Sequence, residues 1–175
     1  MFDFITMWFT QGFYHPLQTP QQLLLIISLG LLVSQQGKVQ QGLFTFMLSI
    51  LCGFILNRTL SIELNTELML LGVALSTSLL CLIKLPFNSI LLIVIILSCG
   101  LLMGYDSNPI RIPGLGDKIM LHWFLGAGLS MILSFIVVMI ISLIVKPFWD
   151  GLTIRIFSSW LATSALIVLT LKIAT

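Results

Sequence analysis

Hydrophobic residues in this chain form long runs, which are separated by short polar or proline- and glycine-containing stretches. A helix that crosses the roughly 30 Å hydrocarbon core of a bilayer needs about 20 mostly apolar residues. The runs approach or reach that length, and the first has room to extend backwards through the proline-containing segment before it. The pattern predicts six membrane-spanning helices, at residues 20–34, 39–56, 66–83, 87–104, 119–145 and 152–173.

The connections between these spans indicate a compact bundle. Links at residues 35–38 and 84–86 are short, which predicts antiparallel neighbouring helices. Pro86 disfavours continued helix and ends the third span. Residues 105–118 form the one sizeable polar loop. We therefore expect a single all-α domain, a polytopic transmembrane bundle of about six spans.

Composition supports a membrane location and excludes one class of partner. The chain is 58% hydrophobic and only 8% charged, whereas a soluble domain carries roughly 25% charged residues. Its formal net charge is +2 and it has no long basic run. Lipid is thus the expected surrounding, and nucleic acid is not an expected partner.

The distribution of lysine and arginine bears on orientation, because cytoplasmic loops carry an excess of both while acidic residues count little. We expect both termini on the outer side, although the number of basic residues is nearly the same at the two ends of the bundle. The basic residues at one end of the predicted bundle are Lys38, Lys84, Lys146 and Arg155, and those at the other are Arg58, Arg111, Lys118 and Lys172.

Small residues four positions apart recur within the spans, and this spacing lets apolar helices approach closely. A packing role needs no ligand. The pairs are Gly30 with Ser34, Gly72 with Ser76, Ala74 with Ser78, and Gly100 with Gly104.

Two groups of polar residues are candidates for a functional site, because polar side chains at membrane depth are unfavourable unless they are used. His15, Gln18 and Gln22 share one face of a helix, although Pro16 and Pro20 interrupt regular structure there. An interfacial histidine also has a purely structural interpretation.

The second group lies at the end of the fourth span, where Cys99, Met103 and Asp106 are four and three residues apart and share a face. Soft sulfur ligands favour Cu(I), and a carboxylate is a harder ligand. Methionine and cysteine within a span are also ordinary packing residues. No nucleophile with a base, phosphate loop or paired intramembrane carboxylates is present, so we do not expect an enzyme.

The segment GFYHPLQTPQQLLLIISLGL, residues 12–31, resembles the first-helix signature of the HupE/UreJ family of small nickel and cobalt permeases. That signature reads G-x-x-H-P-[LIV]-[ST]-G-x-D-H. Gln21 and Gln22 stand where the family has its Asp-His pair. The matching residues are Gly12, His15, Pro16 and Leu17, followed at the expected distance by Gly30 and Leu31.

Two further stretches carry the resemblance. SCGLLMGYD, residues 98–106, is similar to the family motif F-H-G-x-[AV]-H-G-x-E: Gly100 and Gly104 match, and Cys99, Met103 and Asp106 replace the two histidines and the glutamate. LLGVALSTSLL, residues 70–80, resembles E-x-G-[IV]-A-x-S. It keeps Gly72, Ala74 and Ser76 and has Leu70 in place of the acid.

The resemblance implies a six-helix permease fold in a bacterial inner membrane and leaves two hypotheses for function. In the first, His15, Cys99, Met103 and Asp106 form a rebuilt site that passes a transition-metal ion, either a softer one such as Cu(I) or nickel or cobalt. In the second, the chain is a non-transporting structural or assembly subunit of a larger membrane complex, such as a copper or nickel enzyme. No cofactor beyond such an ion is expected, and the partners left open are other membrane subunits and a second copy of the chain.

Overall fold

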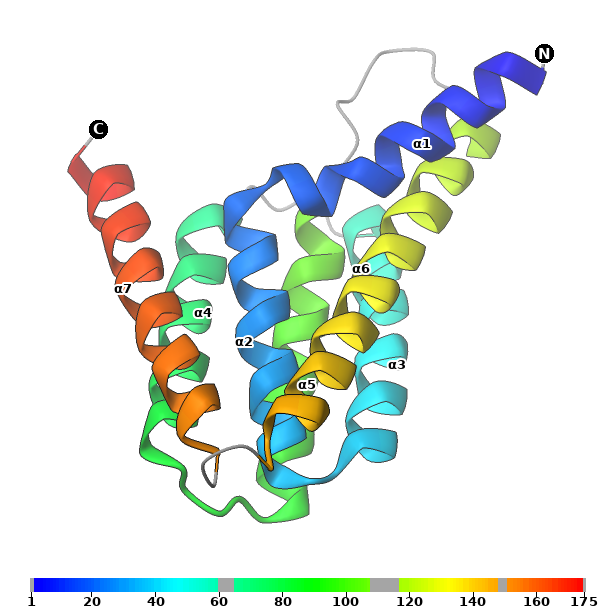
Figure 1. The fold of residues 1–175 in the computed structure, drawn as a ribbon. Helices are drawn as coiled ribbons and strands as arrows, with labels where there is room; N and C mark the ends of the chain where they lie inside the picture. Colours follow the sequence, from blue (N-terminus) through cyan, green and yellow to red (C-terminus); the bar gives the residue numbers. More distant parts are fainter. Residues whose placement is uncertain (1, 60–64, 108–116, 148–150, 175) are drawn as a thin grey trace.

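The computed structural model describes residues 2–59, 65–107, 117–147 and 151–174, which form seven helices and no strand. The all-α prediction is confirmed, and each predicted span falls on a helix (Figure 1). Residues 108–116 of the predicted polar loop lie outside this description. The helices are α1 (Phe2–Gln18), α2 (Pro20–Gln36), α3 (Val39–Thr59), α4 (Thr66–Ile83), α5 (Ser89–Asp106), α6 (Asp117–Val145) and α7 (Leu152–Ala174).

The length and composition of these helices fit a membrane. Helices α3 to α7 each contain a stretch long and apolar enough to cross it, and the count becomes six when α1 and α2 are taken together as one bent span. Large apolar side chains face outward, including Phe44 at 79% exposure and Ile90 at 69%. Since lipid solvates such side chains, the chain is an integral membrane protein.

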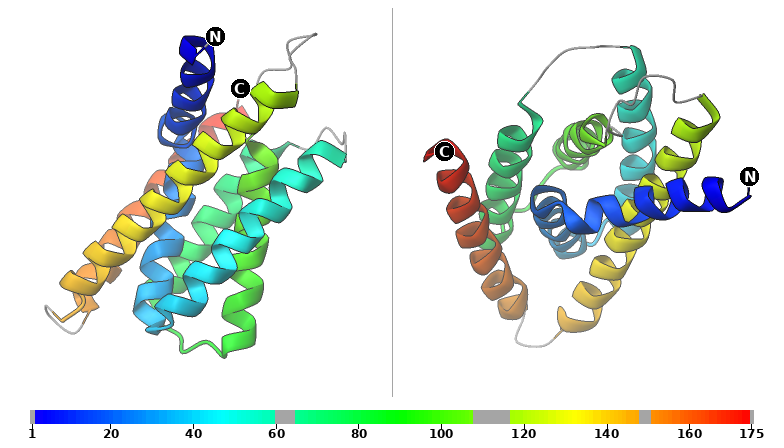
Figure 2. Two further views of the ribbon diagram at one scale, coloured as in Figure 1. Left: turned by 90° about the vertical axis from the view of Figure 1, so that its right-hand side faces the viewer. Right: turned by 90° about the horizontal axis from the view of Figure 1, so that it is seen from above.

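Helices α1 and α2 meet at an angle of 70°. Thr19 between them has an extended backbone, with φ −93° and ψ 108°, and Pro20 is the first residue of α2. Proline suits a first helical position because its fixed φ is helical and because the N–H that it lacks would have no partner within the helix there. The proline-containing lead therefore forms a separate helix, which lies across one end of the bundle and over α6 (Figure 2).

Helix α2 occupies the centre of the bundle, with the other spans around it (Figure 2). It contacts each of the other six helices and has ten buried residues. Gly37, at φ +70°, ends it in the left-handed conformation that glycine adopts freely. Lys146, the residue after α6, donates hydrogen bonds to the carbonyl oxygens of Ser34 and Gln35, at 3.1 and 3.2 Å, and so satisfies two carbonyl groups in the last turn of α2.

The small residues have different surroundings. A Cβ built on Gly104 would lie 2.6 Å from the carbonyl oxygen of Ile50, and one on Gly30 would lie 2.7 Å from the side chain of Val138. These glycines permit the α3–α5 and α2–α6 contacts, and Gly100 belongs to the first of them. By contrast, a Cβ on Gly72 would meet nothing within 4 Å, and Ser76 is exposed. Within the described residues, the Gly72 and Ser76 pair therefore does not form a close helix–helix contact.

Helix α1 begins and α7 ends at the same end of the bundle (Figure 1). At the opposite end, basic side chains bond backbone carbonyls: Lys38 donates to Phe87 at 3.0 Å, and Arg155 donates to Leu82 at 3.0 Å. Arg111 and the side chain of Lys118 lie outside the described residues. Which end faces the cytoplasm stays a prediction.

We predict that Gly104→Ala destabilises the protein, because the added methyl group would meet the backbone of α3. Overpacking of this kind lowers the free energy of unfolding by about 1–3 kcal/mol. The matched control is Gly72→Ala, where the space is open and alanine is the better helix former by about 0.5–1 kcal/mol. Thermal unfolding in detergent should show a lower midpoint for the first variant only. Equal midpoints would contradict the close contact between α3 and α5.

Candidate functional site

The carboxylate of Asp106, at the end of α5, joins three helices. Gln22 of α2 donates a hydrogen bond from Nε2 to Oδ2 of Asp106 at 2.7 Å. Thr66, the first residue of α4, donates from Oγ1 to Oδ1. Gln22 is fully buried, and the other two residues are partly buried. Hydrogen bonds to an ionised acceptor are stronger than neutral ones, so this cluster holds the ends of α2, α4 and α5 together.

Two buried polar atoms near this carboxylate have no hydrogen-bond partner among the described residues, namely Nδ1 of His15 and Oε1 of Gln22. The Gln22 amide is oriented by its bond to Asp106, because only its nitrogen can donate to a carboxylate. An unsatisfied buried polar group disfavours the folded state by about 1–3 kcal/mol. One ring nitrogen of His15 and the amide oxygen of Gln22 are therefore open to a bond with a ligand.

His15 is held against an aromatic side chain. Its ring meets that of Trp123 edge-on, with centroids 5.5 Å apart, and Trp123 donates from Nε1 to the carbonyl oxygen of Ser107 at 3.2 Å. His15 lies on α1, outside the straight spanning helices. Burial lowers its pKa below the ordinary value, and the negative charge of Asp106 opposes that shift. The imidazole is thus mainly neutral at pH 7 and able to act as a ligand.

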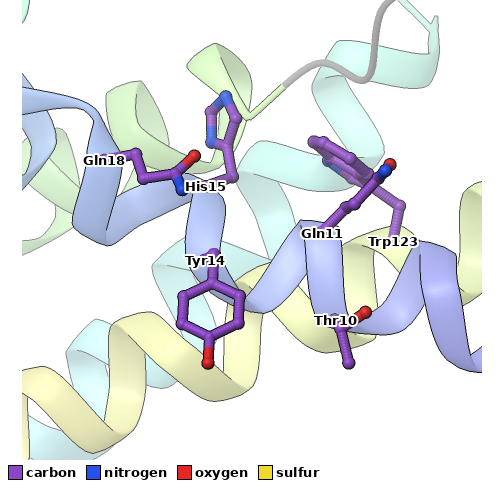
Figure 3. A pocket seen from close by; sticks show the side chains of 6 residues that line it. All are labelled: Thr10, Gln11, Tyr14, His15, Gln18 and Trp123. Carbon is purple, nitrogen blue, oxygen red and sulfur yellow. The ribbon is translucent and has the colours of Figure 1, made fainter.

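An open pocket of about 440 Å³ lies beside His15, along α1 and the start of α6. Figure 3 shows the rings of His15 and Tyr14 directed to opposite sides of α1. His15 therefore forms part of the wall of an open pocket at this end of the bundle. Its lining residues are Thr10, Gln11, Tyr14, His15, Gln18 and Trp123.

The predicted sulfur ligands lie in a different environment. Cys99 and Met103 are fully buried and belong to the hydrophobic core. They point to the interior from the same helix as Asp106, as their spacing predicts, but their surroundings are apolar. Within the described residues, no three side chains of the His, Cys, Asp or Glu type lie close enough together to hold a metal ion. The structure brings His15, Gln22 and Asp106 into one region and leaves the two sulfur atoms in the core.

The other positions that differ from the family motifs have structural surroundings of their own. Gln21 is partly buried, and Leu70 is fully buried in the core. Thr66, which the sequence analysis did not single out, lies one helical turn before Leu70 and supplies the bond to Asp106. A polar residue at the start of an apolar span, one turn before Leu70 and on the same helix face, could have been recognised in the sequence as a possible site residue.

Comparisons of the chain with protein-family models, with curated proteins and with solved structures found no match in any of the three.

We predict that Thr66→Val destabilises the protein by about 1.5–3 kcal/mol, because one oxygen of the Asp106 carboxylate loses its donor. Thr59→Val is the control, since the exposed Thr59 hydroxyl donates only to carbonyls of its own helix. The measurement is the thermal unfolding midpoint in detergent at neutral pH. If both variants unfold at the same temperature, the bond from Thr66 to Asp106 has no stabilising role.

Proposed function

We propose that the protein binds a divalent transition-metal ion at the end of the bundle that carries Asp106, as the first step in passing that ion across the membrane. The observation that supports this is the pair of buried, unpartnered atoms, Nδ1 of His15 and Oε1 of Gln22, beside a carboxylate. Together the three groups offer one nitrogen and several oxygen atoms. Few polar groups in a native structure are buried without a hydrogen-bond partner, and a bound ion is one explanation for those that are.

The chemistry of these donors favours Ni²⁺ or Co²⁺ over Cu(I). Imidazole suits borderline divalent ions such as nickel, and carboxylate and amide oxygens are harder ligands, whereas Cu(I) prefers thiolate and thioether. The resemblance to the HupE/UreJ family points the same way, because His15 is the histidine of its first motif and Asp106 replaces a glutamate. Cys99 and Met103, by contrast, are packed among apolar side chains. We therefore assign binding to the end cluster rather than to the sulfur pair.

The alternative is a non-transporting structural or assembly subunit of a larger membrane complex. In that case the Asp106 cluster only joins helices, and the unpartnered atoms have no ligand. The two functions differ in a direct measurement, which is whether the purified protein binds and transports the ion.

The proposed site leads to a prediction on metal binding. Titration of the purified protein with Ni²⁺ or Co²⁺ should quench tryptophan fluorescence, because both ions are quenchers and Trp123 lies against His15. His15→Ala should weaken binding by at least about tenfold, a loss typical of disturbing a metal site. His122→Ala is the matched control, since His122 is the other histidine of the chain and lies on α6. Equal affinities for the two variants would contradict the proposed site.

Proteoliposomes that contain the wild-type protein should also take up the ion, and those with His15→Ala should not. If the wild-type protein neither binds nor transports Ni²⁺ or Co²⁺, the transport proposal is wrong. Mild purification that recovers other membrane proteins in fixed proportion would then support the subunit alternative.

A further prediction concerns the pH dependence of metal binding. A protonated imidazole cannot bind a metal, so protons compete with the ion only near the pKa of His15 and below it. Burial lowers that pKa, so binding should persist below the ordinary histidine value of about 6.5 and be lost as the pH falls further. The same titration repeated from pH 7.5 to pH 5 measures this. A half-loss of binding at or above pH 6.5 would show that His15 is not the group in competition.

A further inference from the structure

Basic side chains gather at the end of the bundle opposite Asp106, where the turn after α2 lies beside the link between α4 and α5 (Figure 1). These two connections are joined directly. Gln36 donates from Nε2 to the carbonyl oxygen of Leu85 at 2.8 Å and accepts from the backbone N–H of Phe87 at 3.1 Å. Three cations bond the backbone of these connections or of the helix ends beside them, and we call them the basic end cluster: Lys38, Lys146 and Arg155.

The bonds of the basic end cluster fix its charged groups in place but do not neutralise them, because every acceptor is a neutral carbonyl oxygen. An ammonium group has three N–H donors and a guanidinium has five. Lys38 uses one donor and Lys146 uses two. Arg155 uses only Nε, so both of its terminal nitrogens have no partner among the described residues. Each cation therefore keeps its full charge and at least one donor for a further acceptor.

Among the described side chains, no carboxylate lies near this cluster. Glu67 is in the first turn of α4 and Asp106 is the last residue of α5, which places both carboxylates at the other end of the bundle. There, Glu67 forms an ion pair with Lys172. The charge of Lys172 is thus balanced within the chain, whereas the basic end cluster lacks such a counter-charge in the part of the chain that the structure describes.

The basic end cluster lies at the level of lipid headgroups. Ile144, two residues before Lys146, is 62% exposed, and Ile156, directly after Arg155, is 41% exposed. Such side chains face the lipid tails, so the neighbouring charged groups lie where the hydrocarbon ends. Long basic side chains reach the headgroup region in this way while their carbon stems stay on apolar surface.

We propose that the basic end cluster binds the phosphate group of an anionic phospholipid. Guanidinium matches the geometry of phosphate oxygens, and ammonium groups add charge-assisted hydrogen bonds. Basic pockets between transmembrane helices are known to hold anionic headgroups. A lipid also fits the depth of the cluster, because every integral membrane protein has headgroups beside it at this level. If both termini lie outside, as the sequence predicts, the bound lipid belongs to the cytoplasmic leaflet.

The experiment separates lipid binding from the capping of helix ends, which the same bonds also provide. The full-length protein is placed in nanodiscs that hold equal amounts of phosphatidylglycerol and phosphatidylcholine, and native mass spectrometry counts the lipids that it retains. Arg155→Gln and Lys146→Gln each remove a charge but keep an amide N–H that can bond a carbonyl oxygen. Lys172→Gln is the matched control, because it changes the net charge equally at the other end.

The wild-type protein should retain phosphatidylglycerol in preference to phosphatidylcholine. Each substitution in the basic end cluster should lower the ratio of the two retained lipids about fivefold, the effect expected for one basic residue at an anionic lipid surface. Lys172→Gln should keep the wild-type ratio, and Arg155→Lys, which retains the charge, should lose less than Arg155→Gln. Should Lys146→Gln fail to fold, the exposed Arg155 gives the same comparison.

Equal retention of the two lipids by the wild-type protein would overturn the proposal. A wild-type ratio in both cluster variants, or an equal fall in Lys172→Gln, would do so as well, because the preference would then not come from this cluster. Displacement of phosphatidylglycerol by inorganic phosphate would assign the cluster to the free anion and overturn the lipid as its occupant. None of these results depends on the proposed function, since Ni²⁺ or Co²⁺ is expected to bind at the other end of the bundle.

Discussion

A helix that carries polar side chains into a bilayer must be enclosed by other helices, because lipid offers no hydrogen-bond partners. Helix α2 meets this requirement. Gln22, Ser28 and Ser34 are all fully buried, and α2 is in contact with every other helix. The outer helices present their large apolar side chains to lipid and their inner faces to α2. The arrangement of the bundle therefore depends on keeping one polar helix away from the hydrocarbon.

The bend before α2 explains how the candidate site is built at the end of this central helix. Thr19 and Pro20 stop α1 and start α2 in a new direction. Helix α1 packs on α6, where a Cβ on Gly12 would lie 2.3 Å from the carbonyl oxygen of Trp123. His15 is thereby held against Trp123 and near Asp106. Asp106 ends α5 and is held in place by its hydrogen bonds to α2 and α4. Residues that lie close in sequence, His15 and Gln22, thus approach the carboxylate from two helices that run in different directions.

The hydrophobic runs predicted the spans because their lengths are set by the bilayer, which acts on each helix separately. They did not predict that residues 2–18 form a helix of their own, since the direction of a chain after Thr19 depends on the packing of Gly12 against α6. The spacing of Cys99, Met103 and Asp106 correctly placed them on one face, but a spacing does not say whether that face meets polar or apolar neighbours. Gly72 and Gly104 show the same limit, because the same four-residue spacing of small residues occurs on a face that meets open space and on one that meets another helix.

The bond from Lys146 to the end of α2 also has a consequence for biosynthesis. The carbonyl oxygens of Ser34 and Gln35 are satisfied by a residue more than 100 positions later in the chain, and Gln22 meets Asp106 84 positions later. Helices leave the ribosome in sequence order, so α2 is made long before α5 and α6. Until those helices arrive, its polar side chains need water or the insertion machinery as temporary partners. The central helix of the finished protein is thus among the first to be made and among the last to be completely enclosed.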